Sequence, residues 1–442
     1  MLLPDLAITA QAPILVPPSH PTPFQYLYLS NLDDQLFLRF STKYMFLYQI
    51  KDNDEGDVAE RLQAALARAL VYYYPLAGRL RRSERDEDKL EVVCSGEGAV
   101  FVRARSESTL HDFQRFPKPC KSWRKLLHRV EADSFLGVPP LVVQVTELCG
   151  GLVVCVGMSH CLCDGLGSSQ FVHAWAAIAR GKEPFPLPCW ERELLRPRCP
   201  PQIQYSHPEF MAAHDLSKLK DRLRADAVVR TSLCFTRDQL AELKKTANGG
   251  GRQEEGNSSI VTSFEVLAAH VWRCWIRAME MPGMQSIKLL FSVNVRRKLQ
   301  PQLPRGFYGN GFVLACAETT VKELTESPLS YAVKLVQKAK ARVSDEYVRS
   351  MIDFLADKSV RPDMVASLVI SEWSRMELNT VDFGWGEPLH VGPLASDIYC
   401  LFLPSATCVP YAVDVLLSVP APILHNYVFY MRNLSDPQQL NE

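Results

Sequence analysis

The chain has 442 residues, of which 47% are hydrophobic and 10% aromatic, so its length allows roughly two or three domains with large apolar cores. The formal net charge is +0, which excludes the strong basic field that nucleic acid or an anionic membrane would require. The 13 cysteines follow no zinc or disulfide spacing, and no signal peptide or apolar run of membrane-spanning length occurs, so we expect a soluble, cytoplasmic protein without a bound metal.

Strand-like runs and one long helix open the chain. Residues 36–40 and 44–48 are apolar and aromatic runs of strand length. Asp57 then precedes residues 58–73, in which apolar side chains recur at helical spacing, and Pro75 follows them. Because an aspartate before such a stretch and a proline after it are typical helix limits, we expect a helix over residues 58–73 that Asp57 caps.

A predicted hairpin delivers the most distinctive segment of the chain, residues 157–165 (GMSHCLCDG). Residues 141–145 and 152–156 are apolar, β-branched runs separated by glycines, which predicts two buried antiparallel strands. His160 follows the second run, and a helical pattern begins shortly after it, so we expect the imidazole in a loop between strand and helix. A neutral imidazole there could accept a proton from a hydroxyl or an amine. The alternative is a structural loop histidine near a hydrogen-bonded Asp164.

The second half of the chain begins after a proline-rich stretch of low periodicity, residues 181–208, and we expect a crossover linker over residues 186–225. Such composition predicts a crossover segment that joins two domains, residues 1–185 and 226–442. Thr262 and Glu265 have the spacing of a capping box at the start of a helix. Further strand-like runs follow at residues 287–293, 311–317, 367–371 and 411–417.

A second unusual segment, residues 382–386 (DFGWG), alternates glycine with aromatic side chains. Such a pattern predicts a tight turn that brings its backbone close to a neighbouring segment. Taken alone, it is also typical of a purely structural turn that buries Phe383 and Trp385.

The two segments together resemble the BAHD family of plant acyl-CoA-dependent acyltransferases, in which a His-x-x-x-Asp-Gly segment precedes a distant Asp-Phe-Gly-Trp-Gly segment. Three further segments resemble family motifs in the same order along the chain. They are residues 74–80 (YPLAGRL), 268–273 (AAHVWR) and 303–310 (LPRGFYGN). The resemblance therefore covers nearly the whole chain.

The resemblance implies an α/β fold of two chloramphenicol-acetyltransferase-like domains, each a mixed β-sheet flanked by helices, with a substrate channel between them. It implies an acyl-CoA-dependent O-acyltransferase that moves a hydroxycinnamoyl, acetyl or other acyl group directly to an alcohol within a ternary complex. The partners are then two small molecules, acyl-CoA is a co-substrate rather than a permanently bound cofactor, and the protein is expected to be a monomer. The alternatives are N-acylation of an amine or polyamine, or a non-catalytic partner of a fatty-acid elongation complex.

The resemblance also implies roles for residues of the two main motifs. His160 is expected to be the general base, and Trp385 to offer its indole N–H to the tetrahedral intermediate. Asp164 is expected to point away from the channel and to pair with Arg296, although Asn294 departs from the family's Asp-Gly-Arg. The residues expected to hold a turn near the CoA part of the channel are Asp382, Gly384 and Gly386.

Substrate contacts are implied at five further positions. Thr262 and Ser263, at a helix N-terminus, suit the oxygens of CoA, and Arg297 could meet its phosphates. Arg375 aligns with an arginine that binds the acceptor carboxylate in shikimate-using members, and Tyr44 belongs to the predicted acceptor wall. The apolar character of that wall favours a lipophilic or phenylpropanoid acceptor.

Overall fold

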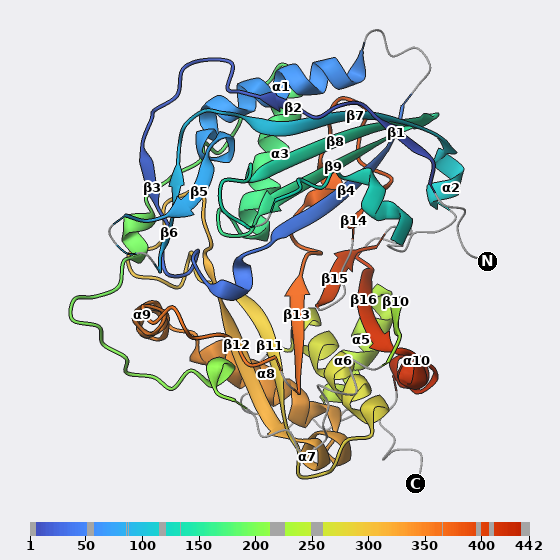
Figure 1. Cartoon of the computed structure of the whole chain (residues 1–442). Helices are drawn as coiled ribbons and strands as arrows, with labels where there is room; N and C mark the ends of the chain where they lie inside the picture. Colours follow the sequence, from blue (N-terminus) through green and yellow to red (C-terminus); the bar gives the residue numbers. More distant parts are fainter. Residues whose placement is uncertain are drawn as a thin grey trace.

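The computed structural model describes residues 6–50, 57–84, 86, 88–114, 121–132, 134–212, 226–248, 260–364, 366–394, 399–405 and 411–434. In these residues, two mixed β-sheets occupy the upper and lower halves of the molecule in Figure 1, with helices packed against each. The prediction of mixed sheets flanked by helices is therefore confirmed. The predicted domain limits stay a prediction.

The first sheet is built mainly from the N-terminal half of the chain. Its order is β1 (Ile8–Ala10), β7 (Ala99–Thr109), β8 (Leu141–Cys149), β9 (Gly151–Ser159), β4 (Ser41–Gln49) and β14 (His390–Pro393), with β2 (Ile14–Val16) paired to β7. A small sheet of β3 (Tyr26–Tyr28), β6 (Leu90–Val93) and β5 (Arg79–Arg82) lies beside it. Because β14 pairs with β4, one strand from the predicted second domain completes the first sheet.

The second sheet combines strands from the C-terminal half of the chain. Its order is β10 (Val228–Phe235), β16 (Val413–Pro420), β15 (Cys400–Pro404), β13 (Ser367–Glu372), β11 (Ser286–Asn294) and β12 (Phe312–Thr320). Strands β11, β13 and β15 are parallel neighbours, whereas the other pairs are antiparallel. The strand runs predicted in this half of the chain all fall within or overlap strands of this sheet.

The helices flank the two sheets. Those of the first half are α1 (Val58–Tyr72), α2 (Leu110–Gln114) and α3 (Gly165–Ala179). Those of the second half are α5 (Arg237–Ala247), α6 (Ser263–Met279), α7 (Val321–Glu326), α8 (Leu329–Arg342), α9 (Asp345–Phe354) and α10 (Leu424–Arg432). Short 3-10 turns are η1 (Leu36–Leu38), η2 (Tyr74–Ala77), η3 (Lys121–Leu126), η4 (Arg192–Leu195), η5 (Pro208–Phe210), η7 (Leu378–Thr380) and η8 (Ala421–Ile423). No helix among the described residues is long and apolar enough to cross a membrane.

Local sequence signals explain several of these limits. The Asp57 side chain accepts a hydrogen bond from the N–H of Glu60 and caps α1, as predicted. Gly150, with a φ of 75°, makes the tight connection between β8 and β9, which pair from Leu141 with Met158 onward. The prediction of a strand at residues 36–40 is wrong, because η1 occupies this position and periodicity cannot separate a short buried apolar run from a turn.

A large apolar cluster packs against each of the two sheets. On the first sheet, α1 contributes Leu62, Leu66 and Leu70, and α3 contributes Trp175, all fully buried. On the second sheet, α6 is buried along most of its length, with Trp272 fully enclosed. The first cluster also includes Leu401 and Leu403 of β15, so the two halves pack against each other. The ends of β4, β9, β11 and β12 form the region around His160.

His270 gives the fold a measurable pH dependence. Its side chain is buried in α6, its Nε2 donates to the carbonyl oxygen of Met431, and burial lowers its pKa to about 4. Because this lies below the unfolded value of about 6.5, the unfolded chain binds the extra proton first, and stability falls as the pH drops through that window. We expect this group to lower the free energy of unfolding by about 2 kcal/mol between pH 7 and pH 5.

Urea unfolding at the two pH values checks this expectation. His270→Gln retains a donor for Met431 but cannot titrate, so the variant should lose this share of the pH dependence. Burial also lowers the pKa of His390 to about 4. The contribution of His390 to the pH dependence of the free energy of unfolding should persist in the His270→Gln variant. A variant with the full pH dependence of the unsubstituted protein would contradict the assignment to His270.

Candidate active site

His160 lies directly after β9, at the end of the first sheet that approaches the second. Its backbone N–H donates to the carbonyl oxygen of Phe40 over 2.9 Å, and the N–H of Leu162 donates back to the carbonyl oxygen of Ser159 over 3.0 Å. The chain therefore turns immediately after the strand. The side chain of His160 is partly buried between segments of both sheets.

Asn310 fixes the tautomer of the His160 ring. The Nδ2 group of Asn310 donates to the backbone oxygen of His160 over 2.8 Å and to Asp33 Oδ1 over 2.9 Å. Both partners can only accept, so the amide oxygen of Asn310 must be the atom that faces His160 Nδ1, at 3.1 Å. His160 Nδ1 therefore carries the proton, and Nε2 keeps a free lone pair.

The environment of the imidazole favours its neutral form. Burial lowers the pKa of His160, while the negative charges of Asp164 and Asp33 and the hydrogen bond to Asn310 oppose that shift in part. A pKa below the ordinary histidine value leaves the ring unprotonated at pH 7. His160 is thus a neutral base with a defined acceptor nitrogen.

Asp164 turns into the protein and holds the loop that carries His160. Its carboxylate caps α3 through the N–H of Gly167 at 3.0 Å and accepts the N–H of Gly311 at 3.0 Å. Arg296 makes a two-pronged ion pair with it, at 2.7 and 3.0 Å, which is the pairing that the resemblance implies. Asn294, the departure from the family pattern, accepts the backbone N–H of Arg296 at 3.1 Å.

Electrostatics keep Asp164 ionised. Burial by itself would raise the pKa of its carboxyl group, but the Arg296 guanidinium and the N–H groups of Gly167 and Gly311 hold the pKa below its usual value. The carboxylate is therefore a structural anion, with its oxygens engaged by these partners.

Asp33 is a site residue that the sequence analysis missed. It is fully buried, and its Oδ1 accepts both the backbone N–H and the Nδ2 group of Asn310, at 2.7 and 2.9 Å. Its Oδ2 accepts the N–H and hydroxyl of Ser30 at 3.0 and 2.7 Å. No spacing in the sequence connects Asp33 with Asn310, because they lie 277 residues apart and meet only in the fold.

Aromatic side chains surround His160. The Phe40 ring meets the imidazole edge-on at 5.2 Å, and the Phe312 ring lies at 5.9 Å. Tyr399 stacks on Phe40 at 6.3 Å. Phe312 and Tyr399 continue into an apolar cluster between the sheets that also contains Phe37, Met364, Leu290, Leu314, Cys316 and Val369.

The structure does not bring Trp385 to His160, so the predicted catalytic role of Trp385 is corrected. The Trp385 ring packs on Tyr48 at 5.8 Å and beneath Arg61 at 5.0 Å. Tyr48 pairs with Leu152, whereas Ser41, at the other end of β4, pairs with the residue before His160. Seven residues of strand span roughly 23 Å, so the indole lies far beyond hydrogen-bond reach of the reacting atoms.

The Asp382 turn is a structural feature at that distant end of the first sheet. Asp382 accepts the N–H groups of Gly384 and Gly386 at 2.7 and 2.9 Å and pairs with Arg180 at 2.7 Å. Both glycines have positive φ, 117° and 89°, which side-chain-bearing residues rarely adopt. The turn thereby seats Phe383 in the core against Trp175, at 4.8 Å.

Replacing Trp385 by phenylalanine distinguishes a catalytic role of the indole N–H from a packing role of the ring. The variant keeps a ring against Tyr48 but loses the indole N–H. We expect kcat within about twofold of the unsubstituted enzyme and a loss of about 1 kcal/mol in the free energy of unfolding. An oxyanion donor would instead cost about 10²–10³ in kcat, so a loss of that size, measured in steady state on folded protein, would restore the catalytic role.

The other predicted substrate residues lie in different surroundings. Tyr44 is fully buried in the core of the first sheet against Trp373, at 4.9 Å, so the prediction that it lines an open acceptor wall is wrong. The prediction fails because the Tyr44 side chain points to the helix-covered face of β4. Arg375 is exposed just after β13, near Glu372.

The predicted CoA residues lie at the start of α6 and in the loop after β11. Thr262 caps α6 in a full capping box with Glu265, as predicted, and Ser263 is the first helical residue. Arg297 is exposed beside Arg296. The half-buried first turn of α6 presents backbone N–H groups and the positive end of the helix dipole, which favour an anion.

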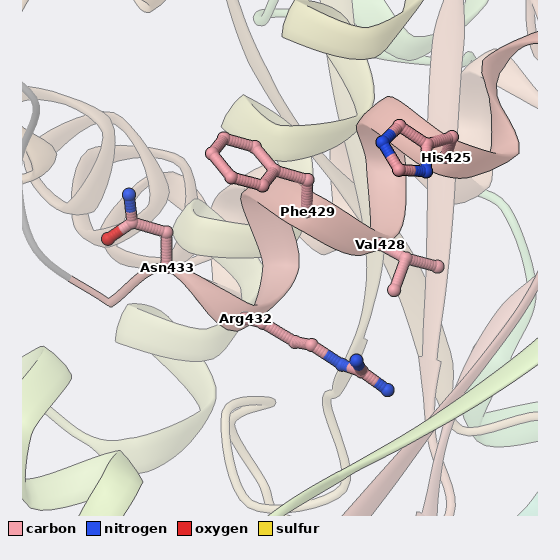
Figure 2. Close-up of a pocket in the computed structure, with 5 residues that line it drawn as sticks. All are labelled: His425, Val428, Phe429, Arg432 and Asn433. Atoms are coloured by element: carbon pink, nitrogen blue, oxygen red, sulfur yellow. The ribbon is translucent and has the colours of Figure 1, made fainter.

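Two other features lie outside this region. A surface hollow lined by His425, Val428, Phe429, Arg432 and Asn433 is formed by α10 and the residue after it (Figure 2). The described parts of the chain contain no cluster of three or more histidine, cysteine or acidic side chains that could hold a metal ion.

Comparison of the sequence with known proteins points to one family. A family model described as the Transferase family matches residues 6–416. The chain is 38% identical over 421 residues to omega-hydroxypalmitate O-feruloyl transferase of Arabidopsis thaliana, covering 94% of this chain and 91% of the relative. It is 37% identical over 424 residues to fatty alcohol:caffeoyl-CoA acyltransferase of the same plant, covering 94% of this chain and 96% of the relative.

Solved structures share the fold at lower identity. The structure of TRI101 from F. sporotrichioides, complexed with coenzyme A and T-2, superposes with a TM-score of 0.74 at 16% identity. The match covers 92% of this chain and 97% of that one.

Proposed function

We propose, since the chain belongs to the Transferase family of BAHD acyl-CoA-dependent acyltransferases, that it moves an acyl group from a coenzyme A thioester to an alcohol. The observation that carries this proposal is the His160 imidazole, whose Nδ1 proton is engaged by Asn310 so that Nε2 is left as the base. The enzyme is an O-acyltransferase of non-aminoacyl groups.

The proposed reaction uses His160 twice. Nε2 takes the proton of the alcohol hydroxyl as its oxygen attacks the thioester carbonyl carbon. The tetrahedral intermediate collapses with cleavage of the carbon–sulfur bond, and the imidazolium returns the proton to the CoA sulfur. The amide oxygen of Asn310 accepts a hydrogen bond from Nδ1–H in both the neutral and the protonated ring, so the ring keeps its orientation in both steps.

Direct transfer is favoured over a covalent thiol intermediate. Cys161 and Cys163 are buried beside the loop. Burial raises the pKa of both thiols, that of Cys163 to about 11. Both cysteines are therefore neutral thiols and poor nucleophiles at pH 7.

The acceptor is proposed to be an aliphatic alcohol and the donor a hydroxycinnamoyl-CoA. Phe40, Phe312 and Tyr399 give the surroundings of His160 an apolar character suited to a hydrocarbon chain. Two relatives at 38% and 37% identity are named for ω-hydroxypalmitate or a fatty alcohol as acceptor and for feruloyl or caffeoyl groups.

The remaining assignments follow from this reaction. Acyl-CoA is a co-substrate, held through Thr262, Ser263 and Arg297, with no permanently bound cofactor. Arg375 is proposed to contact the outer end of the acceptor. We further propose a cytoplasmic monomer of two domains, residues 1–185 and 226–442, joined by residues 186–225.

A donor and acceptor screen tests the proposal. Purified protein is incubated with feruloyl-CoA, caffeoyl-CoA, benzoyl-CoA or acetyl-CoA and with hexadecan-1-ol, 16-hydroxyhexadecanoate, benzyl alcohol or spermidine, and release of free thiol is followed. We expect the highest kcat/KM with a hydroxycinnamoyl-CoA and a long-chain alcohol. Turnover with spermidine alone would establish N-acylation instead, and CoA binding without any turnover would support a non-catalytic role.

A further inference from the structure

Arg192 is a buried cation in the crossover segment. It begins η4, and its side chain is fully enclosed. Its Nη2 group donates to the carbonyl oxygens of Leu162 and Tyr308 at 2.6 and 3.0 Å, and its Nε donates to Tyr308 as well, at 3.2 Å. One guanidinium thus joins the loop that carries His160 to the segment that carries Asn310.

The same guanidinium faces Asp33. Arg192 Nε lies 3.7 Å from Asp33 Oδ2, and both side chains are fully buried. Among the described residues, no other ion pair reaches Asp33. A buried carboxylate is costly unless hydrogen bonds and a cation balance it. The hydrogen bonds come from Ser30 and Asn310, and Arg192 is the cation that offsets the negative charge of Asp33.

The backbone around Arg192 is also built to hold it in place. The N–H of Cys189 donates to the carbonyl oxygen of Gly306 at 2.9 Å, and the N–H of Tyr308 donates to the carbonyl oxygen of Cys189 at 2.8 Å. A Cβ atom at Gly309 would lie only 3.0 Å from Arg192 Nε. The crossover segment is therefore paired with residues 306–308 at the point where Arg192 enters the core.

We propose that Arg192 is a positioning residue for His160, which it acts on through Asp33 and Asn310 and through the carbonyl oxygen of Leu162. The relay runs from Arg192 to Asp33, from Asp33 to both N–H groups of Asn310, and from Asn310 to His160 Nδ1. It rests on the proposed role of His160 as the base and extends that role to the crossover segment. The segment between the two sheets thereby helps to select the tautomer of the reacting imidazole.

Two negative charges act on the imidazole, and they differ in how they are balanced. Asp164 faces it from the start of α3 and is held by Arg296 at 2.7 Å. Asp33 faces it from the N-terminal segment and depends on Arg192. Removing Arg192 would therefore expose His160 to the full negative charge of Asp33, which favours the imidazolium form.

Nuclear magnetic resonance of protein labelled with ¹⁵N-histidine measures the pKa and the tautomer of His160 directly. The His160→Gln variant assigns the signal. In the unsubstituted protein we expect a neutral ring protonated at Nδ1. In Arg192→Met we expect the pKa of His160 to rise by about half a unit or more and the neutral ring to populate both tautomers. The midpoint of the rising limb of kcat/KM with pH should move with that pKa.

Arg349→Met is the matched control. Arg349 also anchors the crossover segment, through the carbonyl oxygen of Leu194 at 2.9 Å, but it lies in α9 and pairs with Asp345. We expect this variant to leave the pKa and tautomer of His160 unchanged. Adding Asp33→Asn to Arg192→Met removes both members of the ion pair and should return the pKa toward its original value.

A folded Arg192→Met protein with an unchanged His160 pKa and tautomer would overturn the proposal. If Arg192→Met does not fold, Asp33→Asn carries the test, because loss of the charge should lower the pKa of His160, and an unchanged pKa would again overturn it. The resonance measurement needs no turnover. An altered imidazole in a protein that transfers no acyl group would therefore reject the proposed function and leave this inference standing.

Discussion

His160→Gln is expected to lower kcat/KM by about 10³-fold or more, because general base catalysis by a positioned histidine contributes about 10²–10⁴. The glutamine amide can still donate to Asn310 but cannot take the hydroxyl proton at neutral pH. In the unsubstituted enzyme, kcat/KM should rise with pH through a midpoint below about 6.5, since burial lowers the pKa of the base. Steady-state kinetics over pH 5 to 8 with the best substrate pair from the screen measure both effects.

His173→Gln provides the control for the same chemical change. His173 lies in α3 and its Nε2 donates to the carbonyl oxygen of Glu377 at 3.0 Å, away from the reacting imidazole. Its replacement should leave the rate and the pH profile as they are. Activity that survives His160→Gln in folded protein would remove His160 as the base.

Asp164→Ala is expected to lower the free energy of unfolding by about 3–5 kcal/mol, the range for breaking a buried ion pair by removing one partner. The substitution leaves the Arg296 guanidinium without its carboxylate and deprives the N–H groups of Gly167 and Gly311 of their acceptor. The loop that carries His160 should lose order together with the start of α3. Urea unfolding and amide hydrogen exchange in residues 160–170 measure the two effects.

Two further variants separate a buried charge pair from an exposed one. Glu147→Ala removes the partner of Arg105 on the surface of the first sheet, where the pair is exposed, and should cost no more than about 1 kcal/mol. Adding Arg296→Met to Asp164→Ala should recover part of the loss, because the isolated buried charge disappears. Wild-type stability in Asp164→Ala, with only the pH–rate profile altered, would instead make Asp164 part of the proton relay.

Much of the fold follows from local sequence patterns. Apolar runs around Gly150 predict the hairpin of β8 and β9, and Asp57 and Thr262 predict the starts of α1 and α6. These signals are local because a cap or a tight turn is satisfied within a few residues. Residues 36–40 were assigned wrongly because a short apolar run carries no information on whether its backbone extends or turns.

The site was predicted in part. The motif pattern identifies His160 as the candidate base and implies the pairing of Asp164 with Arg296, which the structure contains. Trp385 and Tyr44 were misplaced, since a motif gives the order of residues but neither the end of β4 at which a turn packs nor the face to which a side chain points. Asp33 and Arg192 carry no motif of their own.

The sequence by itself determined the family, the class of fold and the histidine that can act as the base. Each of these rests on residues that are close together or on motifs that keep their order along the chain. The tertiary structure alone decided which nitrogen of His160 is free, because Asn310 and Asp33 reach it from distant segments. It also decided that Trp385 lies outside the reacting region and that Arg192 lies beside it, because burial and ion pairing depend on neighbours that only folding brings together.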